Sequence, residues 1–121
     1  MKAATVLIIE NQESVRMLLA EVLEDAGYQV CEATNGRQGL EQIHTRPVDL
    51  VITDLEMPEM NGLEVILELT CAFLDVKLIA MNGRAAGERQ KAKSLGAQQT
   101  FPKPHDLHAL LHAVQSELQH S

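Results

Sequence analysis

The chain has 121 residues, of which 45% are hydrophobic and 22% are charged, so we expect one globular domain over residues 1–121 and exclude a disordered or collagen-like chain. Lys and Arg total 10 against 17 Asp and Glu, a net charge of −7 without any basic run, which argues against direct nucleic-acid binding. No apolar run approaches the roughly 20 residues that span a bilayer. The N-terminus also lacks the apolar core of a signal peptide, so we expect a cytoplasmic protein with no membrane contact.

The first half of the chain alternates strand-like with helix-like patterns. The continuous β-branched run Thr5–Ile9 is typical of a strand buried on both faces of a parallel sheet. Residues 13–26 carry apolar side chains at three- and four-residue spacing before Gly27, which predicts an amphipathic helix with a glycine stop. Residues 28–32 alternate as a second strand. Asn35-Gly36 then turns the chain into a second helix, which a following proline ends.

The second half continues the alternation. A strand over residues 48–53 reaches Asp54 where its apolar run stops. The remaining predicted elements are strands over residues 76–81 and 98–102 and helices over residues 63–73, 87–95 and 106–119. Strands that alternate with helices over short connections require parallel pairing with right-handed crossovers. The sequence therefore predicts an α/β fold with a doubly wound, five-stranded parallel sheet and helices on both of its faces.

The cysteines and the C-terminal histidines carry weaker signals. Cys31 and Cys71 have the spacing of neither a metal site nor a redox motif, so we expect two buried free thiols. His105, His108 and His112 lie at three- and four-residue spacing on the last predicted helix. That spacing is compatible with a metal clip on one helix face, but a solvated polar face is the commoner arrangement and the one we expect.

Polar residues follow the apolar runs of four predicted strands. Glu10 and Asn11 follow the first, Asp54 the third, Asn82 the fourth and Lys103 the fifth. Because ligands of open α/β sheets bind beyond the carboxyl ends of the strands, we expect these side chains to share one crevice. Neighbouring carboxylates repel each other unless a cation lies between them, and oxygen ligands select a hard cation such as Mg²⁺. With a lysine to bind phosphate, the pattern is typical of phosphoryl transfer to a carboxylate, here Asp54.

The stretch from Asp54 to Gly62, Asp-Leu-Glu-Met-Pro-Glu-Met-Asn-Gly, resembles the receiver domain of two-component response regulators. The run Asp49–Ile52 before it and Lys103-Pro104 after it match the same family, and the likeness covers the whole chain. The resemblance implies a flavodoxin-like (βα)5 fold that takes a phosphoryl group onto Asp54 from a sensor histidine kinase or phosphotransfer protein. Any enzymatic activity it implies is limited to self-phosphorylation from a phosphodonor and autodephosphorylation, and excludes a metabolic enzyme.

The resemblance also implies roles for individual residues. Four positions match the family's Mg²⁺ site: Glu10, Asn11, Asp54 and the backbone carbonyl of Glu56. Lys103 and Asn82 match positions that contact the phosphoryl group. The signal would reach a downstream protein through the surface of the fourth helix, fifth strand and fifth helix, and the last two helices could also form a homodimer.

Three positions depart from the family pattern. Asn11 replaces the second acid after the first strand, and because an amide oxygen brings no charge we expect a weaker affinity for Mg²⁺. Asn82 stands in place of the switch Thr or Ser, and Thr100 in place of its aromatic partner. Phe101 follows one position later, which places it on the opposite face of a strand. The usual hydroxyl-and-aromatic relay is therefore absent.

These departures leave more than one function class open. The first is a receiver phosphorylated at Asp54, and the second is a pseudo-receiver, a module of the same fold that binds proteins independently of phosphorylation. A third is a flavin carrier or an enzyme on this fold. A flavin or nucleotide phosphate would require a Gly-, Ser- or Thr-rich cradle after the first strand, whereas Glu10-Asn11-Gln12-Glu13 places two acids there. The third class is therefore the least favoured.

Overall fold

The computed structural model describes residues 3–54, 62–72, 75–82, 99–102 and 107–119. Its strands are β1 (Thr5–Ile9), β2 (Gln29–Ala33), β3 (Leu50–Asp54), β4 (Lys77–Asn82) and β5 (Gln99–Pro102). The described helices are α1 (Glu13–Asp25), α2 (Gly36–Thr45), α3 (Gly62–Ala72) and α5 (Leu107–Gln119). The helix predicted over residues 87–95 lies outside the described residues. Within the described part of the chain, no helix has the length and apolarity needed to cross a membrane.

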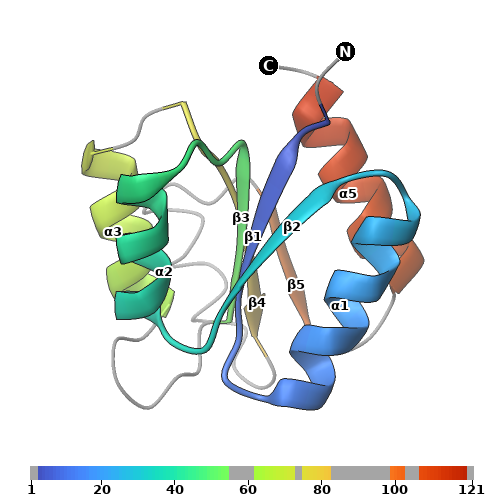
Figure 1. Cartoon of the computed structure of the whole chain (residues 1–121), viewed down its shortest axis with the longest axis horizontal. Coiled ribbons are helices and arrows are strands. Elements are labelled where there is room, and N and C mark those ends of the chain that lie inside the picture. The colour runs from blue at the N-terminus through green and yellow to red at the C-terminus, as the bar shows by residue number, and fades with distance from the viewer. Residues whose placement is uncertain (1–2, 55–61, 73–74, 83–98, 103–106, 120–121) are drawn as a thin grey trace.

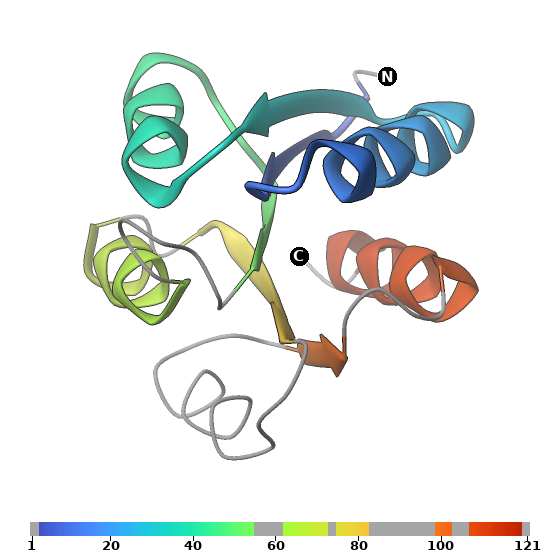
Figure 2. The ribbon, with the colours of Figure 1, turned by 90° about the horizontal axis from the view of Figure 1, so that it is seen from below.

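The strands form one parallel sheet in the order β2-β1-β3-β4-β5. Helices α1 and α5 cover one face of this sheet, and α2 and α3 cover the other (Figures 1 and 2). The chain leaves β1 toward β2 on one side and later returns to place β3 on the other side of β1. The predicted α/β fold, a doubly wound parallel sheet with helices on both faces, is confirmed.

The continuous apolar run of β1 is explained by burial on both faces. Val6 and Ile8 pack in the cluster with α1 and α5, whereas Leu7 and Ile9 pack in the cluster with α2 and α3. All four side chains are fully buried. Burial contributes roughly 1.5–3 kcal/mol for each side chain of this kind. This short strand therefore joins the two halves of the core.

The third strand begins two residues later than the predicted range 48–53 and ends at Asp54, where the apolar run was expected to stop. The backbone of Asp54 still pairs with Met81 of β4. Asp54 is consequently the last residue of a central strand and not the first residue of a loop. The backbone of β3 is paired with β1 on one side and with β4 on the other, which fixes the direction in which the strand ends.

Both cysteines are free, as predicted, but the prediction that both are buried is wrong. Cys31 is half-buried in β2, which has a sheet neighbour on one side only. Its Sγ accepts a hydrogen bond of 3.3 Å from Nη1 of Arg46. Cys71 is exposed on α3, whose buried stripe runs through Val65, Ile66 and Leu69. An apolar neighbourhood in sequence does not separate the inner from the outer face of a helix.

The predicted glycine stop of α1 is confirmed. The Gly27 N–H donates to the carbonyl of Glu24 at 3.0 Å, and the Tyr28 N–H donates to the carbonyl of Leu23 at 3.1 Å. This pair of bonds is the Schellman arrangement, which requires a left-handed residue just after the helix. Gly27 has a φ of 100°, in the region that residues with a Cβ rarely adopt.

Replacing Gly27 tests this helix end. No atom lies within 4 Å of a Cβ added at Gly27, so any cost of Gly27→Ala comes from the backbone conformation alone. We expect Gly27→Ala to lower the free energy of unfolding by about 1 kcal/mol, measured by urea denaturation. Gly27→Asn should lose less, because Asn tolerates this conformation better. Equal stability of the Ala variant and the wild type would contradict this account.

Candidate functional site

Two carboxylates lie at the carboxyl ends of neighbouring strands. The register pairs Ile9 of β1 with Thr53 of β3, and Glu10 and Asp54 are the next residues along each chain. Both are completely buried, with 0% of their surface exposed. The sheet order changes direction between β1 and β3, and ligands of open α/β sheets bind at such a switch point. The structure therefore brings together these two of the predicted site residues.

Glu10 is held by hydrogen bonds to β2 and to the turn that follows β1. Its backbone N–H donates to the carbonyl of Ala33 in β2 at 3.0 Å. Its Oε2 accepts a hydrogen bond of 3.0 Å from the backbone N–H of Gln12. Gln12 is the residue that precedes α1, and its own side chain makes no capping bond. The Glu10 carboxylate thus shapes the turn between β1 and α1.

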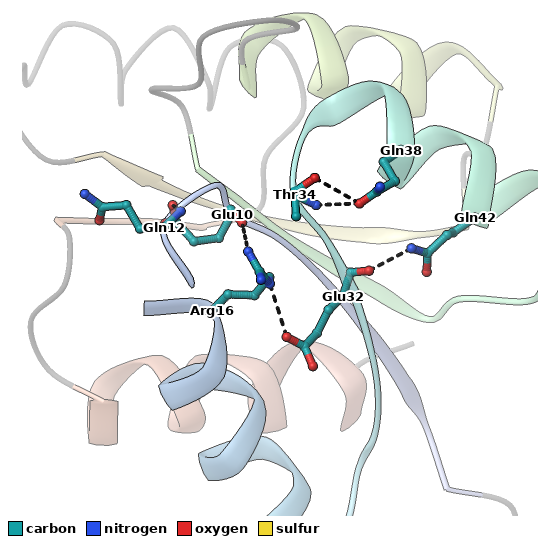
Figure 3. Close-up of polar contacts among 7 residues, drawn as sticks. All are labelled: Glu10, Gln12, Arg16, Glu32, Thr34, Gln38 and Gln42. Carbon is teal, nitrogen blue, oxygen red and sulfur yellow. Dashed lines mark hydrogen bonds and ion pairs between the residues drawn. The ribbon is translucent and has the colours of Figure 1, made fainter. Parts of the chain in front are cut away.

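Arg16 is a polar residue of this region that the sequence analysis did not identify. Its Nη1 donates to the backbone carbonyl of Glu10 at 2.9 Å, and its Nε donates to Oε1 of Glu32 at 3.2 Å. Figure 3 shows the Arg16 side chain between these two residues. The Arg16 side chain is 14% exposed and that of Glu32 is 42% exposed. Arg16 and Glu32 are 16 positions apart, so only the packing of α1 beside β2 reveals the pair.

The connection from β2 to α2 is fixed by amide side chains (Figure 3). Oδ1 of Asn35 caps α2 by accepting the N–H of Gln38 at 2.8 Å. Oε1 of Gln38 in turn accepts from the N–H and the hydroxyl of Thr34, at 2.7 and 3.1 Å. Nε2 of Gln42 donates to the carbonyl of Glu32 at 2.7 Å. The strand that carries Glu32 is therefore tied to the helix that follows it.

The structure describes only some of the other predicted site residues. Asn11 is exposed in the turn after β1. Asn82 is the last residue of β4, which lies beside β3, so its backbone is at the same edge of the sheet as Asp54. Glu56 and Lys103 lie outside the described residues.

The relay positions on β5 are placed by backbone register. Thr100 pairs with Ala80, and Phe101 pairs with Met81. Ala80 and Met81 belong to the two different core clusters on opposite faces of the sheet. The alternation expected for Thr100 and Phe101 is therefore present in the backbone.

The chemistry of the buried acids fits a magnesium ion. Mg²⁺ is commonly held by one or two carboxylates, with waters and phosphate oxygens completing its shell, and Glu10 and Asp54 offer two carboxylates on adjacent strands. Over the residues that the structure covers, no three His, Cys, Asp or Glu side chains gather into a metal site. His108 and His112 are exposed on α5, and His105 lies outside the described residues.

A cavity of about 1060 Å³ opens at the opposite end of the sheet. It is lined by residues near the amino ends of β1, β2 and β4, among them Thr5, Gln29 and Lys77. Tyr28 is also part of its wall, and burial raises the pKa of the Tyr28 phenol. Because the two buried carboxylates lie at the carboxyl ends of the strands, this cavity is separate from the candidate site.

Comparison with known proteins agrees with this geometry. Residues 6–115 match the response regulator receiver domain. The chain is 35% identical over 116 residues to sporulation initiation phosphotransferase F of Bacillus subtilis, which covers 93% of this chain and 92% of the relative. It is 36% identical over 103 residues to the chemotaxis protein CheY of Thermotoga maritima, covering 82% of this chain and 84% of that protein.

Solved structures of receiver proteins have a similar fold. The chemotaxis protein CheY4 of Vibrio cholerae matches with a TM-score of 0.87 at 27% identity, over 95% of this chain and 98% of that one. The family match spans most of the sequence and includes both buried carboxylates, so the resemblance carried by the stretch from Asp54 to Gly62 is confirmed. This chain belongs to the response regulator receiver domain family.

Proposed function

We propose that the protein is a phosphorelay receiver that accepts a phosphoryl group on Asp54 from a phosphohistidine of a sensor histidine kinase or phosphotransfer protein. One observation carries the proposal: Asp54 is fully buried as the last residue of a central strand, beside a second buried carboxylate at the end of the neighbouring strand. Membership of the receiver family supports the same role. A phosphotransferase among the relatives supports exchange of the group with another protein.

The reaction is an in-line displacement at phosphorus. One carboxylate oxygen of Asp54 forms a bond to phosphorus while the bond from phosphorus to the donor's imidazole nitrogen breaks. The imidazole keeps the electron pair of that bond, and the product on this chain is an acyl phosphate. Asp54 contributes a nucleophile whose direction is fixed, since β3 is paired along both of its edges.

Magnesium would be held by the carboxylates of Glu10 and Asp54, with the Asn11 amide oxygen and the Glu56 backbone carbonyl as further ligands. When bound, Mg²⁺ neutralises negative charge on the transferring group. We propose that Lys103 and Asn82 contact the phosphoryl oxygens, on the basis of the family match. The output would pass through the surface that includes β5 and α5 to a downstream protein.

A pseudo-receiver is the second candidate. The observation that favours it is Asn11, an uncharged and exposed side chain at the position of the second acid. Loss of that charge lowers the attraction of the site for a divalent cation. In this case the fold would bind its partner without modification of Asp54.

Phosphorylation of Asp54 can be tested by mass spectrometry of the intact chain. After incubation with Mg²⁺ and acetyl phosphate, we expect the wild type to gain one phosphoryl group and Asp54→Ala to gain none. Asp75→Ala is the matched control, since Asp75 is exposed at the other end of the sheet, and it should be modified like the wild type. An unmodified wild type that also shows no thermal shift with Mg²⁺ would favour the pseudo-receiver.

The role of position 11 can be tested by restoring the acid. Asn11→Asp should raise the affinity for Mg²⁺ about tenfold or more, because a further carboxylate near a divalent cation is worth over 1.4 kcal/mol even in a partly solvated site. Calorimetric titration measures this affinity directly. Gln12→Glu adds the same charge at the neighbouring exposed position and should change the affinity much less. Equal effects of the two substitutions would show that position 11 does not contact the metal.

A further inference from the structure

The Arg16 bridge consists of the Arg16 guanidinium, the Glu10 carbonyl and the Glu32 carboxylate. It joins three elements: the end of β1, the first turns of α1 and the edge strand β2 (Figure 3). Arg16 is largely covered, and its backbone N–H is part of the helix through a bond of 2.9 Å to the Gln12 carbonyl. The guanidinium is a planar fork with several donors, so one side chain can hold two acceptors in fixed directions.

The bridge acts on the peptide unit between Glu10 and Asn11. The peptide bond is planar, so a hydrogen bond to the Glu10 carbonyl fixes the plane that joins these two residues. The same segment is held at the Glu10 N–H by Ala33 and at the Gln12 N–H by the Glu10 carboxylate. Arg16 supplies a further constraint, from a side chain outside the turn.

We propose that Arg16 is a positioning residue for the magnesium site. It touches neither the metal nor the phosphoryl group, and acts by orienting the Glu10–Asn11 peptide from which two proposed ligands project. The inference rests on the proposed function, because it concerns the same metal site. Outer partners that orient metal ligands typically change metal affinity by 10- to 100-fold when they are removed.

The positive charge of Arg16 allows a positioning role to be distinguished from a purely electrostatic effect. A guanidinium close to a cation site repels the cation, so charge alone predicts that removing Arg16 strengthens Mg²⁺ binding. The Glu32 carboxylate at 3.2 Å from Nε offsets part of that repulsion. Positioning predicts the opposite sign, because a freed Glu10–Asn11 peptide must be ordered again when the metal binds. The direction of the change therefore distinguishes the two effects.

The test compares Arg16→Met with Arg46→Met in the full chain, with Mg²⁺ affinity measured by calorimetry. Both substitutions remove one positive charge and a guanidinium that donates hydrogen bonds, but the bond of Arg46 is to Cys31 at the other end of the sheet. We expect Arg16→Met to weaken Mg²⁺ binding about tenfold and Arg46→Met to leave it within about twofold of the wild type. At saturating Mg²⁺, the rate of phosphorylation of Arg16→Met by acetyl phosphate should return to near the wild-type rate.

Arg16→Lys keeps the charge but has a single ammonium in place of the fork, so its Mg²⁺ affinity should fall between the wild type and Arg16→Met. If Arg16→Met does not fold, a Lys variant that binds Mg²⁺ as the wild type does overturns the proposal. Unchanged or tighter binding by a folded Arg16→Met also overturns it. A wild type that binds no Mg²⁺ and takes no phosphoryl group overturns the proposed function and this inference together, which is a different result from an unaffected Arg16 variant.

Discussion

The burial of two carboxylates at the ends of β1 and β3 is the constraint on which the rest of the site depends. Removing an ionised carboxylate from water costs several kcal/mol unless hydrogen bonds or opposite charges compensate. The Gln12 N–H compensates the Glu10 carboxylate at Oε2, and the Arg16 guanidinium brings a positive charge to the backbone carbonyl of the same residue. The apolar runs of both strands stop at these acids, so the edge where the core ends is also the edge where charge is concentrated.

Under the proposed function, the two sides of this edge have different roles: the side of β1 holds the metal, and the side of β4 and β5 carries the relay positions. On the side of β1 and β2, side-chain hydrogen bonds join α1, β2 and α2 through Arg16, Glu32 and Gln42. The departures from the family relay, Asn82 and Thr100, stand on the side of β4 and β5. Under the proposed function, the metal-binding part of the site beside β1 therefore does not depend on the relay positions of β4 and β5. A changed relay does not by itself remove the ability of Asp54 to accept a phosphoryl group.

The fold could be predicted from sequence because its strong signals are local. The run Thr5–Ile9 coincides with β1, and Gly27 ends α1 through backbone geometry that few other residues allow. The edge position of Glu10 and Asp54 followed from where apolar runs stop. The Arg16 bridge could not be predicted in this way, because its three members lie on different elements and a salt bridge of this kind leaves no periodic pattern. The exposure of Cys71 was missed for a related reason: a pattern of apolar residues does not fix which side of α3 faces the core.

Asn11 changes the charge balance of the site more than its shape. In the proposed receiver, the carboxylates of Glu10 and Asp54 would match the two positive charges of one magnesium ion. A third acid at position 11 would attract the cation more strongly, but it would also oppose the approach of a phosphoryl group, whose oxygens are negative. The amide lowers both effects. Since phosphate oxygens are themselves good Mg²⁺ ligands, under the proposed function a site with only two acids depends more on the phosphodonor for its metal affinity than a site with three acids would. In the proposed receiver, metal binding and donor binding are therefore coupled more tightly than a full acid pair would make them.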